Sequence, residues 1–156
     1  MSTQRSVFGA LIALAVTFGA AYIGSRFSVD EWYRALSKPS WNPPNWLFGP
    51  VWSLLYLLMA VSVWLVWKEE GFQAAIIPLG IFLLQLVLNA AWSWLFFGLH
   101  KMGIAFTEIL ALWAAILLCI ILFWRINPIS GILLVPYLLW VTFAAALNFT
   151  LWQLNT

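Results

Sequence analysis

The sequence predicts an all-α integral membrane protein, built as a bundle of five transmembrane helices with a short helix in the first loop. Three observations predict this fold: 65% of the 156 residues are hydrophobic, only 8% are charged, and the apolar residues fall into five long runs. Soluble domains contain about 45–50% apolar and about 25% charged residues. A single domain of this length could not enclose so much apolar surface, so lipid must cover much of it.

Each apolar run is long enough to cross a bilayer, which requires about 20 mainly apolar residues in a helix. The runs follow one another within a single domain, residues 1–156, at about 7–25, 47–67, 74–98, 103–124 and 131–152. They are too long and too continuously apolar for barrel strands, which alternate in polarity. Backbone groups in hydrocarbon must be satisfied within the segment, which leaves helices.

The first span is expected to be retained rather than cleaved as a signal peptide, because its apolar run exceeds the roughly 7–15 residues of a signal core. It carries Ala13, Thr17, Ala21 and Ser25 at a spacing of four, a stripe suited to close helix packing. Lys and Arg number four on one side of the membrane and three on the other, which does not set the orientation. A bacterial cell membrane is the expected location, with the mitochondrial outer membrane as the alternative.

The loop between the first two spans, residues 26–46, is expected to be an ordered lid. Ser28 to Glu31 has the pattern of a capping box at the start of a helix. Asp30 and Arg34 stand one turn apart and can pair on the polar face. The opposite face is apolar and consists of Val29, Trp32, Tyr33 and Leu36.

The ionisable residues point to few kinds of chemistry. The net charge of +2 comes from scattered side chains without a basic patch, so nucleic acid is not an expected partner. Cys119 is the single cysteine and offers no metal-type spacing. His100 is interpreted as a solvated loop residue, with axial ligation of a metal or haem as the alternative. Glu108 lies within a span, where it either snorkels to the surface or serves a function.

Three helix faces combine aromatic and polar side chains. They comprise Gln85, Asn89, Trp92, Ser93 and Phe96 on the third span, Tyr137, Trp140, Ala144 and Asn148 on the fifth, and Trp52, Tyr56 and Met59 on the second. Buried amides in a membrane either bond between helices or contact a ligand, and both interpretations stay open. The small Ala144 beside the large indole of Trp140 leaves a recess. Flat aromatic walls with few polar groups favour a large planar apolar ligand.

These residues resemble the translocator protein family, also called the tryptophan-rich sensory proteins. The first-loop signature of the family is matched by the run from Trp32 to Pro44, with the sequence Trp-Tyr-Arg-Ala-Leu-Ser-Lys-Pro-Ser-Trp-Asn-Pro-Pro. Further matches are Gly49-Pro50-Val51-Trp52, Gln85, Asn89, Trp92, Phe96-Phe97-Gly98, Pro136-Tyr137, Trp140, Phe143-Ala144, Asn148 and Trp152. The resemblance covers nearly the whole chain.

The resemblance implies a homodimer of five-helix subunits, each with a ligand pocket closed by the first loop. The family's ligands are porphyrins, cholesterol or related lipids, and benzodiazepine-type compounds. By position, Trp32, Tyr33 and Pro43 belong to the lid, and the pocket is lined by Trp52, Asn89, Trp92, Phe96, Trp140 and Ala144. Phe149 replaces the tyrosine of the family's cholesterol segment and no basic residue follows it, which disfavours a dedicated sterol function.

The leading hypothesis is therefore a membrane binder of porphyrins that acts in tetrapyrrole sensing or trafficking. Porphyrin is its ligand, and no cofactor or metal is expected. One alternative is an enzyme that degrades porphyrin in light, because Trp52 and Trp140 match tryptophans implicated in that reaction in bacterial relatives. A transporter is a second alternative, although no internal repeat or interrupted helix pair is visible. A structural membrane protein with tightly packed aromatics is the third.

Overall fold

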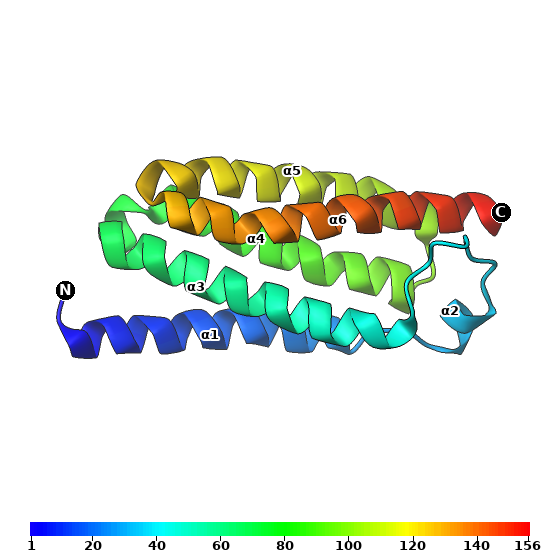
Figure 1. Cartoon of the computed structure of the whole chain (residues 1–156), viewed down its shortest axis with the longest axis horizontal. Coiled ribbons are helices and arrows are strands. Elements are labelled where there is room, and N and C mark those ends of the chain that lie inside the picture. The colour runs from blue at the N-terminus through cyan, green and yellow to red at the C-terminus, as the bar shows by residue number, and fades with distance from the viewer.

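The computed structural model describes residues 1–156 and contains five long helices that lie side by side (Figure 1). The long helices are α1 (Thr3–Ser25), α3 (Phe48–Ala74), α4 (Ile76–Ser93), α5 (Met102–Ile126) and α6 (Pro128–Leu154). The short elements are α2 (Glu31–Ala35), the 3₁₀ turn η1 (Asn45–Leu47) and the π-helical turn η2 (Trp94–Gly98). Five helices are long and apolar enough to cross a membrane, and α2 occupies the first loop. The predicted fold class is confirmed.

The five long helices form a closed ring in the order α1, α3, α6, α5, α4, each packed against its two neighbours. Successive helices run in opposite directions (Figure 1). The lid, the loop before α5 and the C-terminus therefore lie together at one end of the bundle, and the N-terminus lies at the other. This arrangement brings three segments that are distant in sequence to the same membrane face.

The turn between α3 and α4 differs from the sequence-based expectation. The predicted span ended at residue 67, but the helix continues through the exposed Lys68, Glu69 and Glu70. Charged side chains at a membrane surface do not end a helix, since the backbone bonds persist as long as the dihedral angles allow them. The helical conformation is interrupted at Gly71, where φ is 78° and ψ is 176°, a conformation essentially confined to glycine.

Two buried clusters hold the bundle together. The larger one fills the middle of the ring and includes Met59, Phe82, Ile116 and Phe123, each at most 2% exposed. The smaller one lies at the lid end and consists of Tyr33, Phe96, Met102, Ala105, Leu147 and Leu151. Members of both clusters, Tyr56 of the larger one and Tyr33 and Phe96 of the smaller one, line a cavity between the helices.

Helix α1 is held against α3 by a close approach at its N-terminal half. A Cβ atom on Gly9 would overlap the indole ring of Trp67, so only glycine allows this packing. The indole Nε1 of Trp64 donates to the carbonyl oxygen of Ser6 at 2.9 Å. Both tryptophans lie near a span end, and they also bind α1 to the ring.

The lid helix begins at a different residue from the one predicted. Asp30, and not Ser28, caps α2, since its Oδ1 accepts the backbone N–H of Tyr33 at 2.9 Å. Arg34 consequently pairs with Glu31 at 3.0 Å and not with Asp30. The predicted capping box and the predicted Asp30–Arg34 pair are therefore wrong: aspartate caps a helix as well as serine does, and the helix begins one residue after Asp30.

Candidate ligand-binding cavity

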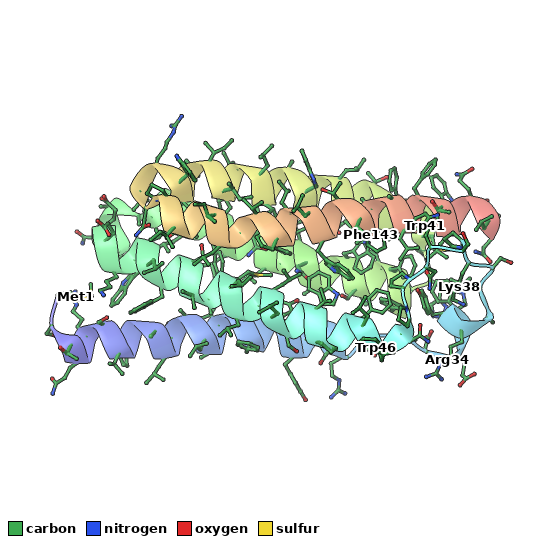
Figure 2. The ribbon with its side chains drawn as sticks, in the orientation of Figure 1. Met1, Arg34, Lys38, Trp41, Trp46 and Phe143 are labelled. Atoms are coloured by element: carbon green, nitrogen blue, oxygen red, sulfur yellow. The ribbon has the colours of Figure 1, made fainter.

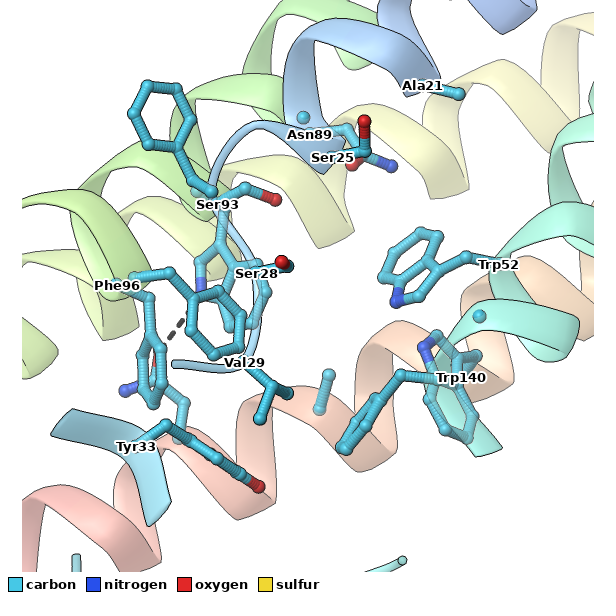
Figure 3. A pocket seen from close by; sticks show the side chains of 18 of the residues that line it. Ala21, Ser25, Ser28, Val29, Tyr33, Trp52, Asn89, Ser93, Phe96 and Trp140 are labelled. Atoms are coloured by element: carbon cyan, nitrogen blue, oxygen red, sulfur yellow. Dashed lines mark hydrogen bonds between the residues drawn. The ribbon is translucent and has the colours of Figure 1, made fainter. Parts of the chain in front are cut away.

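Helices α1, α3, α4 and α6 enclose a cavity of about 300 Å³ beneath the lid (Figure 3). No charged side chain is among its 24 lining residues. Its aromatic lining consists of Phe18, Phe27, Tyr33, Phe48, Trp52, Tyr56, Trp92, Phe96, Phe97, Trp140 and Phe143. Sites for small molecules span roughly 300–1,000 Å³ and combine apolar walls with a few polar groups. The cavity lies at the small end of that range.

The structure brings most of the predicted ligand-contacting residues to this cavity. Tyr33, Trp52, Asn89, Trp92, Phe96, Trp140 and Ala144 line it. Trp32 and Pro43 do not line it. Trp32 packs edge-on against Phe96 with ring centroids 5.6 Å apart, and the carbonyl of Pro43 accepts from Asn42 within the lid. The contact of any of these residues with a ligand stays a prediction.

Two tryptophans form one wall of the cavity. The rings of Trp52 and Trp140 are perpendicular, with centroids 6.4 Å apart, and Figure 3 shows them side by side. The indole Nε1 of Trp140 is buried and has no hydrogen-bond acceptor. A buried donor without an acceptor costs about 1–3 kcal/mol. The N–H itself does not reach the cavity surface, so this wall offers a ligand the two large flat rings.

The floor of the cavity is a hydrogen-bonded network between helices. Tyr56 donates to Oδ1 of Asn89 at 3.0 Å, and Nδ2 of Asn89 donates to the hydroxyl of Tyr137 at 2.7 Å. The hydroxyl of Tyr137 donates in turn to Oε1 of Gln85 at 2.7 Å. These bonds join α3, α4 and α6. The sequence left open whether the buried amides bond between helices or contact a ligand. The structure shows the bond between helices for Asn89 and Gln85.

A second polar link fixes the aromatic wall near the lid. Nε1 of Trp92 donates to Oδ1 of Asn148 at 2.9 Å, and Nδ2 of Asn148 donates to the carbonyl of Met102 at 2.9 Å. Trp92 stacks on Phe96, with ring centroids 5.2 Å apart. Phe96 belongs to η2, whose widened turn is of the kind that often occurs at functional sites. The turn places Phe96 and Phe97 on the cavity wall.

The sequence-based reasoning missed the contribution of α1. Ala21, Gly24 and Ser25 line the cavity, whereas the small-residue stripe was interpreted only as a packing surface. Its first half does pack, since Ala13 and Thr17 are buried. Its second half faces the cavity. The signal that could have revealed this is the increase of hydroxyl-bearing and small residues toward the end of the span.

The lid closes the cavity through a buried tyrosine. Tyr33 is 1% exposed, and its hydroxyl donates to Oδ1 of Asn42 at 3.1 Å. Burial raises the pKa of Tyr33 above its usual value of 10. The phenol therefore stays protonated at neutral pH. Nζ of Lys38 lies 5.0 Å from the centre of its ring on the outer side.

Glu108 and Trp113 lie outside the cavity. Both carboxylate oxygens of Glu108 are buried and accept no hydrogen bond. Of the two alternatives left open for Glu108, the structure does not show snorkelling to the surface, because Glu108 shares a face of α5 with the buried Ala105 and Leu112. Trp113 donates to Oγ1 of Thr142 at 2.8 Å and serves as packing between α5 and α6.

Comparison with known proteins identifies the family. Residues 10–153 match the model of the TspO/MBR family. The chain belongs to the TspO/MBR family. It is 42% identical over 147 residues to the Translocator protein of Homo sapiens, covering 91% of this chain and 86% of that protein.

Other TspO/MBR relatives come from distant organisms. The Tryptophan-rich protein TspO of Archaeoglobus fulgidus is 40% identical over 155 residues, covering 99% of both chains. Protein CrtK of Rhodobacter capsulatus is 41% identical over 140 residues, covering 87% of this chain and 86% of that protein. The similarity extends over the lid and all five long helices. The protein is therefore a multi-pass membrane protein of the TspO/MBR family.

Proposed function

We propose that this TspO/MBR protein binds porphyrins or similar planar apolar molecules in the cavity beneath the lid and acts in tetrapyrrole sensing or trafficking. The observation that carries the proposal is an aromatic cavity without charged lining residues inside a ring of membrane helices. Charged groups would favour water or ions, whereas flat indole and phenyl rings favour a flat ring system. The lid accounts for the retention of the ligand.

The proposal is tested by titrating the detergent-purified protein with protoporphyrin in the dark and following tryptophan quenching. Ala144→Leu adds a bulky side chain to the wall of the cavity. It is expected to weaken affinity about tenfold or more, equivalent to about 1.4 kcal/mol. Ala114→Leu is the matched control, because Ala114 lies on the exposed face of α5.

Trp140→Phe provides a second variant, with Trp124→Phe as its control, since Trp124 is 51% exposed and outside the cavity. The Trp140 variant replaces the indole on the cavity wall with a smaller ring and is expected to weaken binding, whereas the control keeps the wild-type affinity. Quenching that never saturates would refute the proposed binding function. Equal affinities for cavity and control variants would place the ligand elsewhere.

A second candidate function is light-dependent breakdown of the bound porphyrin. It is favoured by the Trp52–Trp140 pair, which places two oxidisable rings on one cavity wall. Illumination of the complex in the presence of oxygen tests it through the loss of the porphyrin absorption band. Loss of the porphyrin absorption band with the wild-type protein, but not with Trp52→Phe, would support the enzymatic function. Stable absorption under light would leave binding alone.

A further inference from the structure

The lid is attached at the end of the bundle where three distant segments meet, namely the lid itself, the loop before α5 and the end of α6 (Figures 1 and 2). Val29 and Tyr33 of the lid line the cavity below. Trp41 of the lid packs on Phe143 of α6, with ring centroids 5.7 Å apart. Two further attachments, one at each end of the lid helix, involve polar side chains.

The first polar attachment is made by Asn155, directly after α6. Its Oδ1 accepts the N–H of Ser37 at 2.9 Å, and its Nδ2 donates to the carbonyl of Ser37 at 3.0 Å. Nδ2 also donates to the carbonyl of Leu151 at 2.8 Å, which orients the amide. One side chain thus satisfies both backbone groups of a lid residue. An amide does not titrate, so this attachment is independent of pH.

The second polar attachment is made by His100, in the loop before α5. Its φ is 58°, in the left-handed region that few residues other than glycine adopt. Among the other residue types, Asn, Asp and His are enriched there. The imidazole stacks on Trp32 with centroids 4.1 Å apart and planes 9° apart. Its Nε2 lies 3.5 Å from Oδ2 of Asp30, whose other oxygen caps the lid helix. The histidine interpreted as a solvated loop residue therefore contacts the first turn of the lid.

We propose that Asn155 and His100 are positioning residues that hold the lid closed, and that the His100 attachment strengthens when the imidazole is protonated. A histidine side chain changes charge between about pH 5 and pH 8. In its charged form it faces the carboxylate of Asp30 and the ring of Trp32, and both attract a cation. The stabilisation is present at the acidic end of this range and is lost as pH rises. The lid is thus expected to open more often at alkaline pH.

His100 is the only histidine of the chain, and histidine is the side-chain type whose ordinary charge change falls in that range. The charged groups near it are Asp30, Glu31 and Arg34 in the lid and Lys101 in the loop before α5. Glu31 and Arg34 pair with each other at 3.0 Å. The phenol of Tyr33 stays protonated, and α4 and η2 carry no charged residue.

The experiment measures amide hydrogen exchange of residues 26–46 in the full-length, ligand-free protein at about pH 5.5 and about pH 8. Protection factors remove the chemical pH dependence of exchange. Wild-type protection is expected to be about two- to fivefold higher at the lower pH, the range of an exposed ion pair. His100 and Asp30 are 40% and 43% exposed at their side chains, which supports that range.

Three variants separate the two attachments. His100→Asn tolerates the positive φ but cannot titrate, and Asp30→Asn still caps the helix but carries no charge. His100→Asn is expected to show equal protection at the two pH values, whereas Asp30→Asn keeps only the attraction of the Trp32 ring and is expected to have a ratio closer to one than the wild type. Asn155→Ala is expected to lower protection at both values by a similar factor and to keep the wild-type ratio between them. If His100→Asn fails to fold, Asp30→Asn still tests the pH dependence.

A wild-type ratio of one, a ratio that persists in His100→Asn, or an unchanged wild-type ratio in Asp30→Asn would overturn the role of His100. Unchanged protection in Asn155→Ala would overturn the role of Asn155. The consequence for ligand release rests on the proposed function and is read separately, as the dissociation rate of protoporphyrin from the same variants. The hydrogen-exchange protection of the lid could behave as expected while porphyrin binding does not saturate. That outcome would support the lid inference and refute the proposed function.

Discussion

Tyr137 offers the sharpest test of the network beneath the cavity. Its side chain is 1% exposed, and its hydroxyl makes two bonds of 2.7 Å, one from Asn89 and one to Gln85. Tyr137→Phe keeps the ring and removes both bonds. It leaves an amide hydrogen of Asn89 and the carbonyl of Gln85 without this partner in the interior of the bundle.

The expected loss follows from the number of groups left unpaired. An orphaned buried polar group costs about 1–3 kcal/mol, whereas interhelical bonds in membranes average about 0.6 and reach about 1.7 kcal/mol. Two such bonds therefore predict that Tyr137→Phe lowers the free energy of unfolding by about 1–3 kcal/mol. The membrane values apply more directly, because the separated helices also find polar partners.

The assay is reversible unfolding in mixed micelles with increasing SDS, followed by circular dichroism. Tyr22→Phe is the matched control, since Tyr22 is 64% exposed and its hydroxyl contacts only Arg26 at 3.3 Å. The control is expected to change stability by less than about 0.5 kcal/mol. Adding Gln85→Met to Tyr137→Phe removes one orphaned carbonyl and should restore part of the loss. Equal stabilities of Tyr137→Phe and Tyr22→Phe would refute the energetic role of the network.

Two further predictions concern glycines. Gly9→Ala places a methyl group against the ring of Trp67 and is expected to lower the free energy of unfolding by about 1–3 kcal/mol in the same assay. Gly19→Ala is the control and should be neutral or slightly stabilising, because its methyl group meets no neighbour. Equal effects of the two substitutions on stability would contradict the close approach of Gly9 to Trp67. Gly71→Ala forces a side chain into a conformation with φ of 78° and is expected to cost about 1–3 kcal/mol. An unchanged midpoint for Gly71→Ala would show that the turn between α3 and α4 relaxes without strain.

The membrane helices were predictable because hydrophobicity is a local property of the chain. A run of apolar residues must be covered by lipid wherever it lies, and its backbone must be paired internally. Helix ends were less predictable. The charged residues after Trp67 mark the membrane surface, but the helix is interrupted only at Gly71, where the backbone leaves the helical conformation.

The cavity was predictable in part, because helical spacing shows which residues share a face. Trp140 and Ala144 share a face of α6, and both line the cavity. Helical spacing does not show which other helix such a face contacts. The faces of α3 and α4 meet in the Tyr56–Asn89 bond, and the contribution of Ala21 on α1 depends on the position of that helix in the ring.

The sequence by itself determined the membrane class, the five apolar helices and the helix faces on which aromatic and amide groups gather, since these follow from composition and periodicity. Only the tertiary structure decided which faces meet, which amides are used between helices and what holds the lid. His100 and Asn155 reach the lid from segments far along the chain, and no local pattern marks either residue. Their roles depend on distances of 2.9–3.5 Å between distant segments, which only the packing of the whole ring creates.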